Sequence, residues 1–126
     1  MTIDEAIGWA DALRPNTFSR EHKLRWLSEL DGRVVRELIE THERGSGETQ
    51  LEFVPYTAET AGDTVLLVPP PYDEMYLEWL RANLDRSYEE FDKFNNSIAL
   101  FNTLFSDYRN DYNRTHLPRR GRIRFW

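Results

Sequence analysis

The chain has 126 residues, of which 40% are hydrophobic and 13% aromatic, and it carries a net charge of −6. This composition excludes a disordered chain and indicates one domain with its own core. The absence of cysteine excludes disulfides, cysteine-ligated zinc and thiol nucleophiles. Residues 1–13 are too acidic for a signal peptide, and the longest aliphatic run, 65–68, is too short to cross a membrane.

The charge is unevenly distributed along the chain. Positions 1–116 hold 12 basic and 22 acidic residues, a net charge of −10, whereas residues 117–126 hold four arginines and no acid. An acidic body repels nucleic-acid phosphates unless positive charge is locally concentrated. We therefore predict a single helical domain over 1–116 and a basic, aromatic C-terminal arm over 117–126. A disordered, solubilising end is the alternative for this arm, but its apolar residues favour docking.

Two helices are predicted in the first third of the chain. Thr2 and Glu5 form a capping box for a first helix that stops before Pro15. Ser19 is the predicted N-cap of a second helix, which ends near 41–42. The apolar face of the first helix is predicted to be Ile3, Ala6, Ile7, Ala10 and Leu13, and that of the second Leu24, Leu27, Leu30, Val34, Val35, Leu38 and Ile39.

A small β-hairpin is predicted between the helices. Residues 51–54 alternate in polarity and residues 65–68 are aliphatic, as expected for two short strands. Two strands are marginal alone, so they would lie on the helices or add to a neighbouring subunit. The three prolines at 69–71 then prevent a helix from starting earlier.

An aromatic stripe dominates the second half of the chain. Residues 72–112 hold ten of the 17 aromatic residues, and the stripe advances in steps of three or four, which predicts one helix face. A straight helix of this length would be about 60 Å long, whereas a domain of this size has a radius of gyration of about 14 Å. We therefore predict two consecutive or kinked helices, near 72–85 and 87–113. The predicted break is a second capping-box pattern at Ser87 and Glu90, with a soft point at 95–97. The predicted fold is mainly α: a bundle of about four helices with a long C-terminal helix pair.

No residue pattern indicates catalysis. His22, His42 and His116 are far apart in the sequence, and the adjacent carboxylates at 73–74 and 89–90 do not converge on one point. Glycine-rich phosphate loops and hydrolase motifs are also missing from the sequence. We therefore expect a protein that is not an enzyme and that has no catalytic residue, cofactor or metal ligand.

The last predicted helix carries the candidates for assembly. Its aromatic stripe is longer than one helix–helix contact can bury, so burial against a partner is favoured over a purely internal core. The five asparagines between 95 and 113 indicate either an exposed polar face or a polar contact between helices or subunits. The predicted assembly face is Tyr88, Phe91, Phe94, Asn95, Asn96, Phe101, Phe105, Tyr108 and Tyr112.

Several strings of the sequence are similar to one group of proteins. Residues 66–80, LLVPPPYDEMYLEWL, and 91–118, FDKFNNSIALFNTLFSDYRNDYNRTHLP, resemble small proteins encoded in structural gene clusters of tailed phages and prophages of Gram-positive bacteria. The strings MTIDEAIGWADALRPNTF and KLRWLSELDG near the N-terminus are similar to the same group. These proteins resemble head–tail connector (adaptor or head-completion) proteins, which are helical subunits that form a ring under the portal.

The resemblance implies a structural virion protein at the head–tail interface, present in the host cytoplasm before assembly. The implied partners are identical subunits in a cyclic homo-oligomer, the portal protein, a tail-proximal stopper or tail-completion protein, and DNA that passes through the lumen without sequence-specific binding. No membrane partner is implied. The implied docking arm for the portal or a neighbouring subunit is Arg119, Arg120, Arg122, Arg124, Phe125 and Trp126.

Two further inferences come from charge alone. A net negative body fits a conduit for DNA, because a negative lumen would let DNA slide without binding. The alternative function is a small helical nucleic-acid-binding regulator that uses the arginine-rich arm to contact phosphates.

Overall fold

The computed structural model describes residues 1–39 and 53–116. It contains four α-helices, α1 (Ile3–Leu13), α2 (Arg20–Val34), α3 (Met75–Ser87) and α4 (Phe91–Thr115). One π-helical turn, η1 (Val35–Ile39), continues α2, and a short 3-10 helix, η2 (Tyr72–Glu74), precedes α3. The prediction of a mainly helical chain of about four helices is confirmed.

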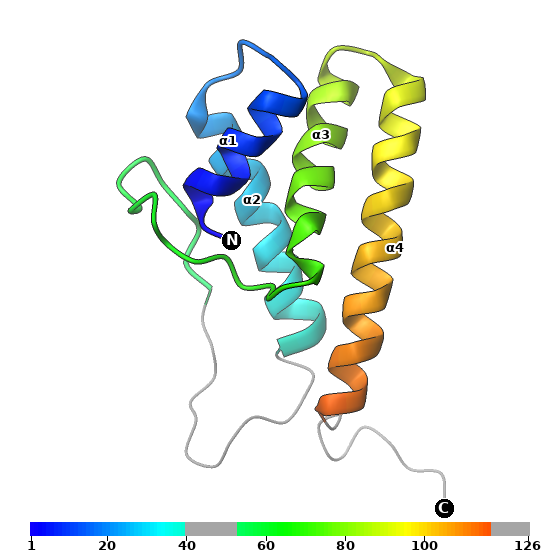
Figure 1. Ribbon diagram of the computed structural model, residues 1–126. Coiled ribbons are helices and arrows are strands. Elements are labelled where there is room, and N and C mark those ends of the chain that lie inside the picture. Colours follow the sequence, from blue (N-terminus) through cyan, green and yellow to red (C-terminus); the bar gives the residue numbers. More distant parts are fainter. Residues whose placement is uncertain (40–52, 117–126) are drawn as a thin grey trace, which may run out of the picture.

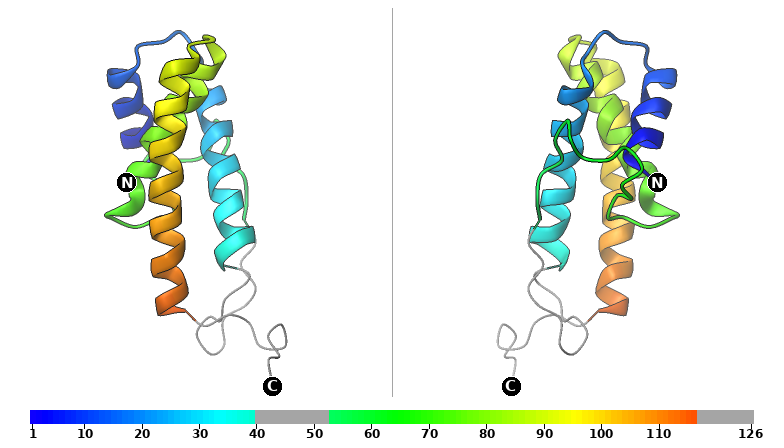
Figure 2. Two further views of the ribbon diagram at one scale, coloured as in Figure 1. Left: turned by 90° about the vertical axis from the view of Figure 1, so that its right-hand side faces the viewer. Right: turned by 90° about the vertical axis from the view of Figure 1, so that its left-hand side faces the viewer.

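The four helices alternate in direction (Figure 1). The α1–α2 and α3–α4 connections lie together at the upper end of the bundle, whereas α2 and α4 both end at the lower end. The irregular segment 53–71 runs along the side of the bundle that is away from α4, as the views of Figures 1 and 2 agree.

Local capping explains where the first two helices begin. The Thr2 side chain accepts a hydrogen bond from the Glu5 N–H at 3.1 Å, and the Glu5 carboxylate accepts one from the Thr2 N–H at 3.0 Å. This is the predicted capping box. The Ser19 hydroxyl likewise accepts from the His22 N–H at 3.4 Å and caps α2. The predicted end of the second helix near 41–42 lies outside the described residues.

Helix α3 is the centre of the bundle. It packs against α1, α2 and α4, whereas α4 packs extensively only against α3 and η2 among the described elements. The Trp79 indole N–H donates to the Trp26 carbonyl oxygen at 2.7 Å and ties α3 to α2. The buried side chains of α3 therefore point in several directions: Met75, Tyr76, Leu77, Leu80, Ala82, Asn83, Leu84 and Asp85.

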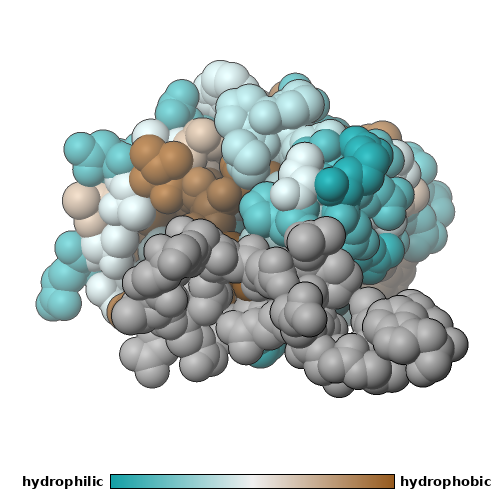
Figure 3. All heavy atoms as spheres, turned by 90° about the horizontal axis from the view of Figure 1, so that it is seen from below, coloured by the Kyte–Doolittle hydropathy of each residue, from teal (hydrophilic) through white to brown (hydrophobic). Residues whose placement is uncertain are grey.

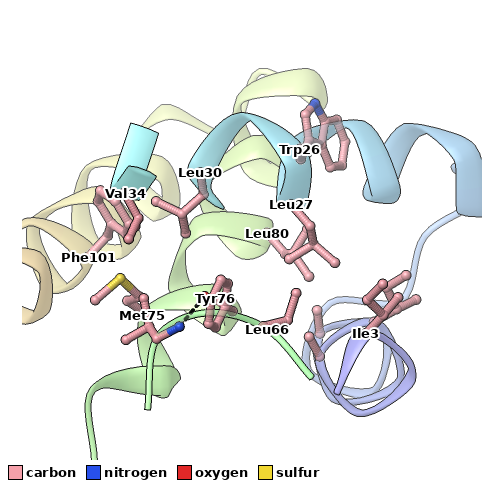
Figure 4. Close-up of a cluster of buried hydrophobic side chains, with 14 of the residues drawn as sticks. Ile3, Trp26, Leu27, Leu30, Val34, Leu66, Met75, Tyr76, Leu80 and Phe101 are labelled. Carbon is pink, nitrogen blue, oxygen red and sulfur yellow. Dashed lines mark hydrogen bonds between the residues drawn. The ribbon is translucent and has the colours of Figure 1, made fainter. Parts of the chain in front are cut away.

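The hydrophobic core lies between α3 and its neighbours. Figure 4 shows Met75, Tyr76 and Leu80 of α3 facing α2, with Phe101 of α4 at one side and Ile3 of α1 at the other. The predicted apolar face of α2 is buried, apart from Ile39, which is partly exposed. One predicted core residue is wrong, because Leu13 is 49% exposed. At the end of α1 the next residue, Arg14, turns towards α3 instead.

A buried carboxylate connects the core to the segment 53–71. Asp31 of α2 is fully buried and accepts hydrogen bonds from the hydroxyls of Tyr56 and Tyr76, both at 2.5 Å. It also accepts from the Leu67 N–H at 3.3 Å. The Tyr76 hydroxyl in turn accepts from the Val68 N–H at 2.8 Å. One side chain therefore fixes α3 and two parts of the irregular segment to α2.

The predicted β-hairpin over 51–68 is not confirmed. Among the described residues there is no β-strand, and Val65 forms an isolated antiparallel bridge with Thr2; residues 51–52 lie outside the described range. The backbone of 64–68 finds other partners: the Thr64 carbonyl accepts from Ile3 N–H and the Leu66 N–H donates to the Met1 carbonyl. Because Asp31 and Tyr76 receive the next two N–H groups, no second strand is needed there.

The predicted break in the long aromatic segment exists, but its details differ. Helix α3 runs to Ser87, whose hydroxyl donates back to the Asn83 carbonyl at 2.8 Å, so Ser87 does not cap α4. The predicted soft point at 95–97 is wrong, since α4 is continuous from Phe91 to Thr115. Ser97 is buried there and donates to Asp85 at 3.3 Å, which gives its polar side chain a partner within the helix packing.

Replacing Tyr76 by Phe tests the buried hydrogen bonds. The variant removes one donor to Asp31 and leaves the buried Val68 N–H without an acceptor, so the free energy of unfolding should fall by about 1–3 kcal/mol. Urea denaturation measures this difference. The control Tyr72→Phe should change stability by less than about 0.5 kcal/mol, because the Tyr72 hydroxyl has no partner among the described residues. Equal effects of the two variants would contradict the assigned role.

The ionisation of Asp31 gives a prediction about pH. Burial raises the pKa of Asp31 above its ordinary value of 3.8, although its hydrogen bonds act in the opposite direction. The carboxyl group of Asp31 therefore keeps its proton to a higher pH in the folded chain than in the unfolded chain. The tighter binding of this proton stabilises the folded chain. This stabilisation is complete below pH 3.8 and is lost as the pH rises through the folded-state pKa.

The stability of the wild type relative to Asp31→Asn, which cannot titrate at this position, should accordingly decrease as the pH rises above 3.8. Guanidinium denaturation of both proteins across this range measures the difference. A difference that grows with pH would show that the hydrogen bonds outweigh burial.

Candidate assembly surface

The turn between α3 and α4 has a specific backbone shape. Glu89 has a φ of 59°, the left-handed conformation that residues other than glycine rarely adopt. The Glu89 N–H donates to the Arg86 carbonyl at 3.0 Å, and the Glu90 N–H donates to the Asp85 carbonyl at 2.9 Å. These bonds close α3 and reverse the chain within three residues, and the turn lies at the upper end of the bundle (Figure 1).

Two aromatic side chains are exposed at this turn. Tyr88 is 45% exposed and Phe91 is 59% exposed. The Tyr88 ring contacts the Phe18 ring at 5.4 Å, and its hydroxyl accepts from the Thr17 N–H at 3.2 Å. This hydrogen bond lowers the pKa of Tyr88. Tyr88 is therefore held in place by the α1–α2 connection while part of its ring stays open to a partner.

Carboxylates surround the exposed aromatic rings. A surface hollow of about 470 Å³ is lined by Glu89, Glu90, Phe91, Asp92 and Lys93, and all five residues are exposed. Lys93 pairs with Glu90 at 2.9 Å, so one of the three carboxylates has a local counterion. We name Tyr88, Glu89, Glu90, Phe91 and Asp92 the α3–α4 surface.

A buried ionic contact supports this surface from below. Asp85, which is 1% exposed, accepts from the Arg14 guanidinium at 3.0 Å and from the Ser97 hydroxyl at 3.3 Å. These three residues come from the end of α1, from α3 and from α4. A buried carboxylate of this kind needs both partners, because an unpaired buried charge is costly. The contact therefore fixes how the upper ends of three helices meet.

The predicted assembly face divides into two groups. Phe101, Phe105 and Tyr108 are buried in the chain's own core, where Phe101 lies 5.0 Å from the Trp79 ring and Tyr108 5.6 Å from the Tyr72 ring. The isolated chain thus buries more of the stripe internally than the sequence predicts, because α3 and η2 cover it. Partly exposed residues are Phe94 and Tyr112, and exposed residues are Tyr88, Phe91, Asn95 and Asn96.

The asparagines of α4 all face outward. Asn95, Asn96, Asn102, Asn110 and Asn113 are exposed, which agrees with the exposed polar face that the sequence left open as one of two interpretations. A contact of these asparagines with another subunit stays a prediction.

A second exposed apolar surface was missed from the sequence. Trp9 and Leu13 of α1 are 54% and 49% exposed and are four residues apart, so they lie on one side of the helix. For Trp9 the available signal was its spacing, because it is two residues beyond Ile7 and so lies off the buried stripe. Leu13 is three residues beyond the buried Ala10, so its spacing gave no such signal. Leu100 is a further exposed apolar residue, on α4.

The lower end of the molecule also exposes apolar atoms. Figure 3, which views the molecule from below, shows a patch of hydrophobic residues left of the centre and hydrophilic residues on much of the remaining described face. The predicted arm residues Arg119, Arg120, Arg122, Arg124, Phe125 and Trp126 lie outside the described residues, as does His42.

The described histidines have local structural contacts. His22 lies 2.9 Å from the Ser19 hydroxyl, and the His116 ring stacks on Tyr112 at 3.9 Å. Within 1–39 and 53–116, no group of three histidines or carboxylates is placed to hold a metal ion. None of the helices in these ranges is long and apolar enough to cross a membrane.

A separate cavity of about 370 Å³ lies between α2 and residues 55–58. Its lining combines the exposed charges of Glu21 and Arg25 with the apolar Leu24 and Pro55. Tyr56, which also lines the cavity, uses its hydroxyl to donate to Asp31.

Comparison of the chain with protein-family models, with curated proteins and with solved structures finds no match. Function is therefore inferred from the surfaces described above and from the sequence strings at 66–80 and 91–118.

The backbone at Glu89 gives a test of the turn. Glu89→Gly should raise the free energy of unfolding by about 0.5–1 kcal/mol, because glycine adopts a positive φ without the steric cost that Glu89 bears. Asp92→Gly is the matched control: it also removes one exposed carboxylate, but its helical position should make it destabilising by about 1 kcal/mol. Thermal and urea denaturation compare the two. Destabilisation by Glu89→Gly would rule out a strained turn.

Proposed function

We propose that the chain is a structural virion protein, a head–tail connector subunit that forms a ring between the portal and the tail. DNA passes through this ring without sequence-specific binding. Residues 117–126 serve as an extended arm that contacts the portal or a neighbouring subunit. A stopper or tail-completion protein binds on the tail side, and the protein is in the host cytoplasm before assembly. The protein has no catalytic role in this proposal.

The observation that carries the proposal is the one-sided packing of α4. This helix has 25 residues, and α3 and η2 are the described elements that cover it extensively. Its exposed side retains Phe91 and Leu100, and Trp9 and Leu13 are exposed on α1. Several exposed apolar surfaces on one small bundle are expected of a subunit that is completed by its neighbours.

Charge and sequence resemblance give further support. Positions 1–116 carry a net charge of −10, which suits passage of DNA and disfavours a nucleic-acid-binding body. The strings at 66–80 and 91–118, which resemble connector proteins, include η2, the first six residues of α3 and all of α4. The resemblance therefore includes the part of the chain that is open to assembly.

The test is assembly with and without a portal. The purified full-length chain, alone and mixed with the portal protein of the same gene cluster, is examined by mass photometry and negative-stain electron microscopy. We expect ring-shaped particles or a portal complex with several copies of the chain. Deletion of residues 117–126 should weaken either assembly.

Monomers alone and also in the presence of the portal would contradict the proposal. Titration with duplex DNA at several salt concentrations distinguishes the connector from the alternative function, a nucleic-acid-binding regulator. Tight, salt-dependent binding that is lost on deleting 117–126 would favour a nucleic-acid-binding protein instead.

A further inference from the structure

We propose that the arm, residues 117–126, of one copy docks on the α3–α4 surface of a second copy. This inference rests on the proposed function, since it names the partner of the arm within the assembly. The contact joins opposite ends of two molecules and uses aromatic anchors surrounded by opposite charges.

The docking face is the α3–α4 surface, at the start of α4 and in the turn before it, where no other described helix packs extensively. Phe91 and Tyr88 present exposed ring surface, and Phe91 lines a surface hollow. The Tyr88 hydrogen bond to Thr17 holds the Tyr88 ring in place before any partner binds, and the hydrogen-bonded turn fixes the backbone from which Phe91 projects. An aromatic anchor that is already held in place loses little conformational freedom on binding.

Charge complementarity identifies the occupant. The docking face carries three exposed carboxylates, Glu89, Glu90 and Asp92, with Lys93 as the adjacent base. The arm carries four arginines and no acid, interleaved with Ile123, Phe125 and Trp126. Arginine and aromatic residues are the types enriched at the energetic centres of interfaces. Within this chain, the arm is the segment whose charge and apolar residues both match the face.

The length of the chain requires a second copy. Helix α4 has 25 residues, so its two ends are about 37 Å apart at 1.5 Å per residue. The docking face is at the start of α4, and the arm follows its end at the other end of the bundle (Figure 1). Ten residues span at most about 35 Å when fully extended, so the arm cannot lie on the α3–α4 surface of its own chain.

The resulting contact is heterologous, because two different surfaces of the molecule meet. Such a contact repeats from copy to copy and closes into a ring when the rotation between copies allows it. A head-to-tail contact of this kind therefore supplies directional assembly without a two-fold axis.

Cysteine crosslinking tests the contact, because the chain has no cysteine of its own. Full-length Lys93→Cys and Gly121→Cys variants, carrying tags of different mass, are mixed under oxidising conditions. We expect a disulfide-linked heterodimer in higher yield than with the control pair Glu29→Cys and Gly121→Cys, since Glu29 is exposed on α2 and remote in sequence from the turn. Equal yields from the two pairs would overturn the proposal. An intramolecular disulfide in a monomeric Lys93→Cys/Gly121→Cys double variant would overturn it as well.

Charge reversal supplies an independent measurement. Glu89→Arg/Glu90→Arg/Asp92→Arg should lower the self-association constant by about 100-fold or more, because like charges then face one another. Reversal of Arg119, Arg120, Arg122 and Arg124 to Glu should do the same, and combining the two sets should restore association. The matched control is Glu29→Arg/Glu59→Arg/Asp63→Arg, which makes the same charge change at exposed positions elsewhere.

Sedimentation velocity measures association, and circular dichroism shows whether each variant is folded. Association that is unchanged by both reversals, or not restored by combining them, would overturn the contact. Portal-dependent rings without the crosslink would overturn this inference and leave the proposed function standing. The crosslink without rings or portal binding would establish the contact and refute the connector function.

Discussion

The fold depends on one carboxylate in its interior. Asp31 accepts hydrogen bonds from two tyrosine hydroxyls and from one backbone N–H, and these donors come from α3 and from the irregular segment before it. Without this acceptor, the Leu67 N–H and the hydroxyls of Tyr56 and Tyr76 would lose the partner that they share in the core. Burial of the charged group is unfavourable, as the raised pKa of Asp31 indicates, so its neighbours must supply donors. Specific donors therefore take the place of a β-sheet in positioning this part of the chain.

The central position of α3 determines which sides of the other helices are exposed. Because α3 is enclosed by α1, α2 and α4, the molecule resembles a core helix with three covering helices. Helix α4 is the longest of them and extends along α3, and none of the other described helices covers its outer side. The same arrangement explains why part of its aromatic stripe is internal and part is exposed. The predicted assembly surface and the core are thus two sides of one helix.

Local sequence signals were sufficient for the starts of the first two helices, and long-range contacts decided the rest. Thr2, Glu5 and Ser19 act within one turn of their helices, so the starts of α1 and α2 could be predicted. The hairpin could not be judged, because the partners of 64–68 come from Met1, Ile3, Asp31 and Tyr76. The partner of Ser97 inside α4 is Asp85, twelve residues away on another helix. The exposed aromatic residues of the candidate site were predicted by type, but their division from the buried ones required the packing of α3.

The contact of Asp85 with Arg14 and Ser97 has a mechanical consequence. It fastens the end of α1 and the first turns of α4 to the same point of α3, close to the exposed residues of both helices. A partner bound at Trp9 and Leu13 and a partner bound at Tyr88 and Phe91 would therefore be held at a fixed mutual angle. In a closed assembly this angle would set the curvature, so an ion pair that lies beneath these exposed residues would help to determine how many copies complete one turn.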